Sequence, residues 1–257
     1  MASQFNLTAL RGTPLEQLET TPLMAPPPGF HSNFINPPSQ STRILIITGI
    51  TVPLIFIFAG LRIYVRIMIN GVFTMDDHLC ILSAFLSMAY TGLTLAMLDT
   101  PGKGPAGPHM WDVPLIRITD NYLRETLATS CLFAIASTTV KTSILIFFAR
   151  LFGRFRSARL MSWSGTVIVT LFYTAWIIPS LPLCVTNLST SQTCSKFISD
   201  MSLAHGIFST FSDFYILFIP IYMISHIQLS PRKQYGAIGI FLTGLAYTLR
   251  FPEPYIF

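Results

Sequence analysis

Long apolar stretches alternate with short polar loops along this chain. A membrane-spanning helix needs about 20 mainly apolar residues, at a rise of about 1.5 Å per residue. The pattern therefore predicts an all-α fold, a polytopic transmembrane helix bundle with six spans. The sixth stretch is the shortest and would cover only about 22 Å of bilayer. The predicted spans cover residues 44–65, 79–98, 122–150, 160–184, 201–227 and 235–250.

The composition agrees with a membrane protein. Hydrophobic residues make up 51% of the 257 residues, charged residues make up 11%, and the mean hydropathy is +0.58. A soluble domain has about 25% charged residues, so this chain could not cover a water-exposed surface, and we expect the lipid bilayer as its main partner. The net charge of +5 does not indicate nucleic-acid binding, because the basic residues lie in short loops where they determine topology.

The basic residues also predict the orientation. Loops after the first, third and fifth spans are richer in arginine and lysine than the other loops. The positive-inside rule places them in the cytosol and the N-terminus outside, as in a multi-pass protein of the plasma membrane. The sequons at Asn6 and Asn187 then lie outside, and we predict that both are glycosylated.

The ends and the cysteines follow from this topology. Residues 1–43 are polar and proline-rich, which predicts an extracellular flexible tail, and 251–257 form a short terminal tail. A disulfide from Cys194 to Cys184, or to Cys131, fits the oxidising outer side. Cys184 would need only a local loop, and four reduced cysteines are the alternative.

Two charges lie in the interior of predicted spans, Lys141 in the third and Asp213 in the fifth. A charge in the hydrocarbon core costs about 3 kcal/mol on insertion scales, so each should have a partner. Their depths along the helices differ by about 7 Å, which a lysine side chain can bridge. We therefore expect an intramembrane ion pair. Pairing of Lys141 with Asp76 or Asp77, or with neither, remains open.

Further charges gather at the predicted cytosolic ends of the spans. They could cross-link the first two spans, or make separate headgroup contacts, where exposed ion pairs contribute little. The aspartates also start a helix, where carboxylates are favoured. The arginines after the third span suit anionic lipid, at about 1 kcal/mol each, or a G protein. This cytosolic charge cluster comprises Arg62, Arg66, Asp76, Asp77, Arg150, Arg154, Arg156 and Arg159.

The loop after the second span is dense in glycine and proline and carries His109 and Trp111. These side chains could contact a ligand, or Trp111 could anchor the chain at the membrane interface. The histidines and cysteines show no metal-binding spacing, and no nucleophile motif is present. We predict no cofactor, no metal site and no enzymatic activity.

A series of short motifs runs from about residue 26 to residue 250. It comprises Pro26-Pro27-Pro28-Gly29, Asn33-Phe34, Pro37-Pro38-Ser39, Arg62, Arg66, Asp76-Asp77, Gly104, Gly107, His109, Trp111-Asp112, Lys141-Thr142-Ser143, Arg150-Leu151-Phe152, Cys184, Cys194, Asp213, Pro220, Gln228 and Arg232-Lys233. Their order and spacing resemble the fungal rhodopsin-domain integral membrane proteins, which have a seven-helix, receptor-like topology. Photochemistry is not expected, since a retinal Schiff base uses a lysine of a seventh helix and Lys141 lies on the third.

The resemblance implies a receptor-like sensor of an unknown extracellular cue, with a cytosolic signalling partner. The alternatives are a small-molecule transporter, for which no internal repeat is visible, and a structural membrane protein. The family has a seventh helix that residues 251–257 cannot supply. We therefore expect a chain truncated before that helix, which includes the alternative of a non-functional truncated gene product.

Overall fold

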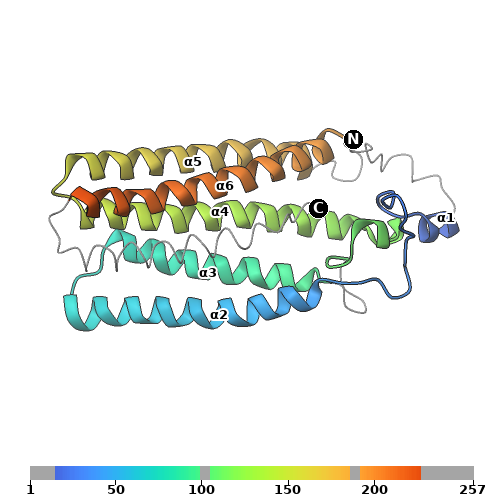
Figure 1. Ribbon diagram of the computed structural model, residues 1–257, viewed down its shortest axis with the longest axis horizontal. Coiled ribbons are helices and arrows are strands. Elements are labelled where there is room, and N and C mark those ends of the chain that lie inside the picture. The colour runs from blue at the N-terminus through green and yellow to red at the C-terminus, as the bar shows by residue number, and fades with distance from the viewer. Residues whose placement is uncertain (1–14, 99–104, 186–191, 227–257) are drawn as a thin grey trace.

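The computed structural model describes residues 15–98, 105–185 and 192–226. Within these ranges the chain is helical and has no β-strand, which confirms the predicted all-α bundle. The long helices run side by side along the long axis of the molecule (Figure 1). The helices are α1 (Leu15–Thr20), α2 (Ser41–Tyr64), the π-helical turn η2 (Val65–Asn70), α3 (Met75–Ala96), the 3-10 turns η3 (Met110–Asp112) and η4 (Leu115–Arg117), α4 (Asp120–Leu151), α5 (Arg156–Val185) and α6 (Gln192–His226).

Five helices of the described ranges are long and apolar enough to cross a membrane. The first five predicted spans coincide with them, although their ends differ by a few residues. The predicted sixth span and the tail 251–257 lie outside the described residues, as do Asn6 and Asn187. The five candidate spans are Ser41–Ile69, Met75–Ala96, Asn121–Leu151, Arg156–Pro182 and Ser202–Met223.

The bundle has two chemically different ends. At one end α2 finishes in η2, α3 begins, α4 ends and α5 begins, and we call this the arginine end (left in Figure 1). At the opposite end α4 begins next to residues 105–118, and α1 lies beyond them (right in Figure 1). We call this the loop end. The helices α4 and α6 run in the same direction, from the loop end to the arginine end, and α5 runs back between them.

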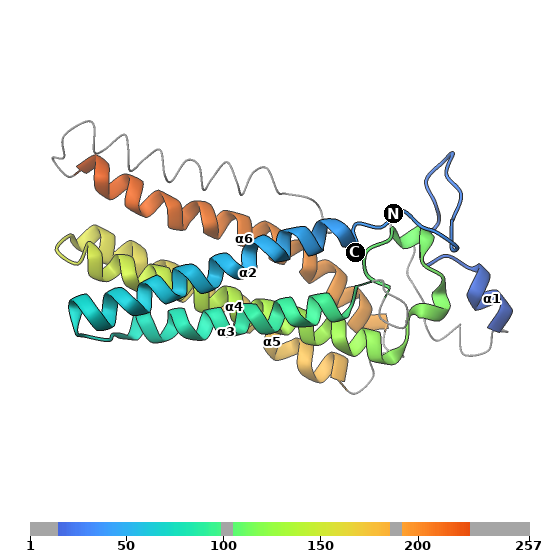
Figure 2. The same ribbon diagram turned by 90° about the horizontal axis from the view of Figure 1, so that it is seen from below.

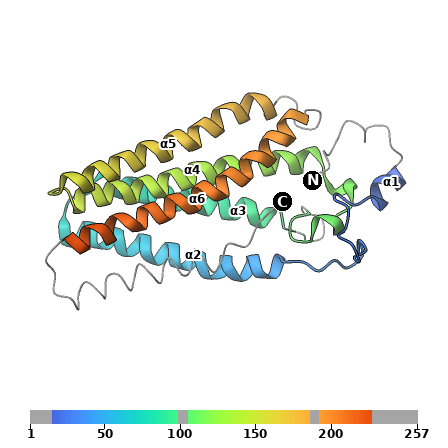
Figure 3. The same ribbon diagram turned by 45° about the horizontal axis from the view of Figure 1, so that its top comes forward.

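Helix α4 is the central element of the bundle. It packs against α3, α5 and α6, whereas α2 packs mainly on α3. Figures 2 and 3 show α2 and α5 on opposite sides of α4. No residue of α2 is buried, so this apolar helix presents most of its surface to lipid. The core therefore lies around α4.

The core consists of apolar side chains between α4, α5 and α6. One part contains Ala134, Val169, Tyr173 and Trp176, and a second contains Leu145, Phe148, Ile216 and Ile219. Gly165 of α5 lets the helices approach closely, since an added Cβ would stand 2.7 Å from the ring of Tyr215 and 3.3 Å from Leu145. Small residues at such crossings are typical of helix packing in membranes.

The proline-rich segment before α2 differs from the flexible tail that the sequence predicts for 1–43. Its described part contains α1 and is joined to the 105–118 loop by backbone hydrogen bonds. The Leu23 amide donates to the Val113 carbonyl (3.0 Å), and the Gln40 amide donates to the Gly107 carbonyl (2.9 Å). Gly107 has a φ of 131°, which favours glycine. The amino-acid composition did not predict this ordered segment, because its hydrogen-bond partners lie about 70 to 90 residues further along the chain.

Candidate functional site

The helix boundaries place four of the predicted charged side chains together at the arginine end. Arg62 lies in the last turn of α2 and Arg66 in η2, and Gly71 ends this helix with a φ of 64°. Thr74 then caps α3 by a capping box, in which the Asp77 carboxylate accepts from the Thr74 amide (3.1 Å). Such reciprocal bonds satisfy the first orphan amides of a helix. The short connection brings the two arginines against the first turn of α3.

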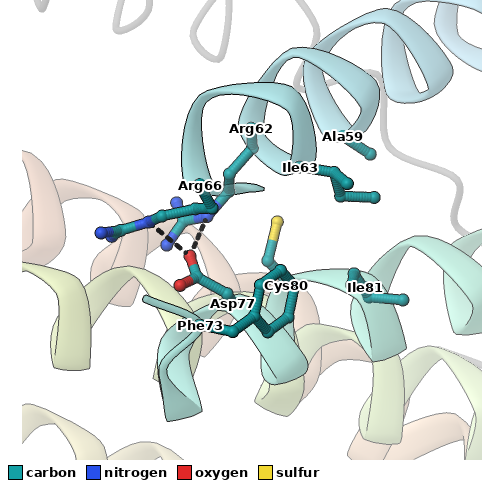
Figure 4. Close-up of a pocket in the computed structure, with 8 residues that line it drawn as sticks. All are labelled: Ala59, Arg62, Ile63, Arg66, Phe73, Asp77, Cys80 and Ile81. Carbon is teal, nitrogen blue, oxygen red and sulfur yellow. Dashed lines mark hydrogen bonds and ion pairs between the residues drawn. The ribbon is translucent and has the colours of Figure 1, made fainter. Parts of the chain in front are cut away.

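Each arginine bridges both carboxylates. Arg62 donates from Nε to Asp77 Oδ1 at 3.0 Å and from Nη2 to Asp76 Oδ2 at 2.7 Å. Arg66 repeats this pattern at 3.0 Å and 3.3 Å. Figure 4 shows both guanidinium groups converging on Asp77 from the α2 side. Such forked, charge-assisted bonds are stronger and more directional than those of neutral groups.

A third arginine joins from α4. Arg150 contacts Asp76 Oδ1 and the Thr74 hydroxyl. The Thr74 hydroxyl also lies 2.6 Å from Asp76 Oδ1 and 2.7 Å from Asp77 Oδ2, so its single proton can serve only one carboxylate at a time. Every carboxylate oxygen of the pair therefore has at least one donor. We call Arg62, Arg66, Thr74, Asp76, Asp77 and Arg150 the arginine cluster.

Two further contacts tie α4 to this cluster. The Ser143 hydroxyl donates to the Asp76 carbonyl at 3.0 Å, and the Arg62 guanidinium lies 5.2 Å from the centre of the Phe147 ring, within cation–π range. The Asp76 side chain is 0% exposed and that of Asp77 is 2% exposed. The cluster thus joins α2, α3 and α4 around two buried carboxylates.

The crevice beside the cluster leaves no room for a bound molecule. It lies between α2 and α3 and is lined by Arg62, Arg66, Phe73, Asp77 and Cys80, with apolar side chains behind them (Figure 4). The lining side chains fill it. The cluster therefore holds α2, α3 and α4 together and does not form a ligand pocket. We call such a contact between helices a helix tie.

The second polar centre is Lys141, in the middle of α4. Its ammonium group lies 3.1 Å from Asp213 Oδ1 of α6, and the lysine side chain is 7% exposed. It also donates to the Ser209 carbonyl at 2.9 Å, the Ser209 hydroxyl at 3.0 Å and the Ser212 hydroxyl at 2.5 Å. Of the two predicted pairings, the structure thus brings together Lys141 and Asp213, while Asp76 and Asp77 bind arginines.

The remaining predicted residues stay apart from these two centres. Arg154, Arg156 and Arg159 are exposed at the arginine end. His109 and Trp111 stack on each other at the loop end, with ring centroids 4.4 Å apart and planes 7° apart. They form part of the loop that holds the N-terminal segment.

The next feature is the state of the four cysteines. Cys80 and Cys131 are free thiols. Because the Cys131 thiol is free, the alternative bridge from Cys131 to Cys194 is not formed, and Cys131 packs against the fully buried Cys184. The side chain of Cys194 lies outside the described part of the chain, and its pairing with Cys184 stays a prediction. Within the described ranges, no three His, Cys, Asp or Glu side chains lie close enough to hold a metal ion.

Sequence reasoning missed the hydroxyl groups of both centres. Thr74 could have been found, because a threonine followed three residues later by an acid is a capping-box pattern. Ser143 stands in the Lys141-Thr142-Ser143 motif, but its contact with Asp76 was not predicted. Ser209 and Ser212 could not have been found, because serines are common in membrane helices and bind backbone carbonyls locally. Only the packing of α4 against α6 selects these two.

The helices and the intramembrane charges define a polytopic helical membrane protein. The family model described as the fungal rhodopsin domain matches residues 61–250, which is most of the chain, so the chain belongs to this family. The matched region begins just before Arg62 and includes both polar centres. Neither a curated protein nor a solved structure matches this chain.

Proposed function

We propose that this protein is a receptor-like sensor of an extracellular cue, in which α4 transmits a change from the loop end to the arginine end. The main observation that supports this proposal is the position of α4. It contributes Cys131 to the packing around Cys184, Lys141 to the membrane-centre pair and Arg150 to the arginine cluster. A small displacement of this helix would affect all three positions, since packed interfaces are bistable rather than continuously deformable.

The arginine cluster is the resting-state contact in this proposal. The side chains of Arg62 and Arg66 are 28% and 17% exposed, whereas that of Arg150 is 47% exposed. Water competes best for the most exposed donor, so the contact of Arg150 with Asp76 is the first to open. Movement of α4 away from α3 would then expose the arginine end to a cytosolic signalling partner.

The continuity of the helices supports a sensor over a transporter. Transporters of the common repeat folds bind substrate at discontinuous helices near the membrane midplane. The five candidate spans are continuous although Pro53, Pro179, Pro182 and Pro220 lie within helices. Engagement of Lys141 by Asp213 and two serines also supports a protein without a retinal Schiff base, and we propose no enzymatic role.

The proposal includes the orientation predicted from the sequence. The arginine end then faces the cytosol and the loop end faces outward at the plasma membrane, where Asn6 and Asn187 are glycosylated and Cys184 pairs with Cys194. Intact cells provide a separate test of this topology. A tag inserted between Arg154 and Arg156 should react with antibody only after permeabilisation, and reaction in intact cells would reverse the orientation.

The sensor proposal is tested by a distance measurement at the arginine end. Spin labels at Met68→Cys in η2 and Leu160→Cys in α5 occupy exposed positions, in a background with Cys80→Ser and Cys131→Ser. In lipid nanodiscs, we expect double electron–electron resonance to resolve two distances, and Asp76→Asn should increase the minor population. The matched control Arg156→Gln, at an exposed arginine outside the cluster, should leave both populations unchanged.

One distance that Asp76→Asn does not alter would contradict a switch at this end. Uniform broadening of that single distance in Asp76→Asn would contradict the switch as well. It would mean that the cluster only restrains the helices and that no second conformation is populated.

A further inference from the structure

A third group of side chains, each buried or partly buried, lies between α4, α5 and α6 outside the arginine cluster and the Lys141 pair. Aromatic rings surround His205 on several sides. Their centroids lie 4.7 Å (Trp176), 5.1 Å (Tyr173), 5.8 Å (Phe172) and 6.2 Å (Phe133) from its ring. Phe208 stacks on Phe172 at 3.7 Å. We call these six residues the His205 cluster.

Two polar atoms of this cluster lack a hydrogen-bond partner. In the described part of the chain, Trp176 Nε1 and His205 Nε2 are buried and make no hydrogen bond, whereas the Tyr173 hydroxyl lies within reach of the Ser137 and Ser209 hydroxyls. Trp176 and His205 are 4% and 6% exposed. Buried polar side-chain atoms nearly always have a partner, and the hydrocarbon core offers no bulk water to supply one. These two ring nitrogens are therefore available to a hydrogen-bonding molecule.

Local rotation cannot give these two nitrogen atoms a partner. Thr142 Oγ1 and Ser162 Oγ are also buried and unpartnered in the described ranges, but a helical hydroxyl can turn to the carbonyl one turn earlier. An indole nitrogen and an imidazole nitrogen stand too far from their own backbone for this. The cluster therefore differs in kind from the isolated hydroxyls.

The position of the cluster suits a ligand that enters from the loop end. His205 precedes Ser209, a partner of Lys141, by one helical turn on α6. Since α6 begins at the loop end, the cluster lies between that end and the Lys141 pair. Tyr173 and Trp176 are three residues apart on α5 and so share a face of the helix.

We propose that the His205 cluster binds a small, uncharged, flat molecule that carries a carbonyl or hydroxyl oxygen. Trp176 Nε1 can only donate, so it requires an acceptor atom on the ligand, whereas Tyr173 Oη and His205 Nε2 can donate or accept. The aromatic rings offer apolar faces to the rest of the molecule. A cation is disfavoured because Ser209 places the Lys141 ammonium group next to this site.

The proposed binding site names the class of molecule that the sensor would detect, and this biological role rests on the proposed sensor function. Binding itself does not depend on signalling. The two are therefore tested by separate readouts, ligand binding at Trp176 and helix distance at the arginine end.

The binding experiment uses the full chain in nanodiscs, with Trp111→Phe and Trp163→Phe so that Trp176 is the single tryptophan. The probe is acetophenone, and toluene, benzylammonium and benzoate are its apolar, cationic and anionic counterparts. We expect a saturable change of Trp176 fluorescence with acetophenone and at least tenfold weaker binding of the other three. Tyr173→Phe and His205→Phe should each weaken acetophenone binding at least fivefold.

Ser162→Ala provides the matched control, because it removes a buried unpartnered hydroxyl of α5 outside the cluster. Its acetophenone binding should equal that of the parent protein. Circular dichroism and the melting temperature establish folding, and His205→Phe should melt no lower than the parent because it removes a polar atom without a partner.

The proposal is overturned if acetophenone gives no saturable change, as expected if water alone fills the site. Equal binding of toluene, tighter binding of benzylammonium, or unchanged binding in folded Tyr173→Phe and His205→Phe would overturn it as well. Saturable acetophenone binding that leaves the Met68–Leu160 spin-label distances unchanged supports the binding site and contradicts the sensor function.

Discussion

The arginine cluster and the His205 cluster are both buried polar groups that join three helices, and α4 belongs to both. They differ in how well their hydrogen-bonding capacity is used. The carboxylates of Asp76 and Asp77 receive donors from Arg62, Arg66, Thr74 and Arg150. In the His205 cluster, Trp176 and His205 each have a ring nitrogen without a partner within the described ranges.

This difference separates a structural contact from a binding site. A polar network that satisfies all its members stabilises the resting arrangement of the helices and leaves no free donor or acceptor for another molecule to bind. An incompletely satisfied network costs stability in the empty state and is completed by a ligand. We therefore assign the helix tie to the arginine end and ligand recognition to the side nearer the loop end.

The largest expected effect comes from removing a carboxylate of the arginine cluster. Asp76→Asn keeps the shape but leaves Arg150 without its carboxylate and leaves Arg62 and Arg66 with Asp77 alone. We expect a loss of about 3–5 kcal/mol in the free energy of unfolding, as for other buried ion pairs that lose one partner. SDS titration in mixed micelles, followed by circular dichroism, measures the change. A loss below about 1 kcal/mol, typical of exposed pairs, would show that the network is not a structural tie.

The next effect concerns the pair at the membrane centre, which is intermediate between the two clusters. Lys141→Met leaves the Asp213 carboxylate without its counter-charge. Because that side chain is 41% exposed at a depth where no bulk water screens the charge, we expect a loss of about 3 kcal/mol. The same titration measures this loss. The double variant Lys141→Met with Asp213→Leu should recover at least half of it, and a double variant less stable than Lys141→Met would contradict the pairing.

The smallest effect concerns the exposed edge of the arginine cluster. Arg150→Gln removes the donor from α4 while Arg62 and Arg66 remain, so we expect a loss of only about 0.5–1 kcal/mol. Arg156→Gln changes the same residue type outside the cluster and should stay within about 0.5 kcal/mol of the parent. Equal losses in the two variants, measured in the same titration, would mean that Arg150 contributes only surface charge.

The fold was largely predictable because lipid imposes a simple rule on sequence. Every spanning segment needs a long apolar helix, and the first five predicted spans coincide with α2 to α6. The ends of the helices were harder to predict than the spans, because capping residues such as Thr74 lie outside the apolar stretches. The ordering of the segment before α2 could not be predicted, since it depends on the 105–118 loop.

The candidate sites were predictable where a charge has to find an opposite charge. Lys141 and Asp213 stand out in apolar spans, and Arg62 and Asp76 lie close together along the chain. Their uncharged partners could not be predicted, because a serine facing another helix looks the same in sequence as one facing lipid. His205, Tyr173 and Trp176 were missed for a similar reason, since aromatic residues in a span are ordinary core or interface residues.

The contrast between a complete and an incomplete polar network is tested most directly by comparing two substitutions in the same SDS titration. Asp76→Asn should destabilise the protein strongly, whereas His205→Phe should leave the free energy of unfolding unchanged or raise it by up to about 1 kcal/mol, since an unpartnered ring nitrogen is removed. Equal losses in both variants, or a loss confined to His205→Phe, would contradict the distinction between the two clusters.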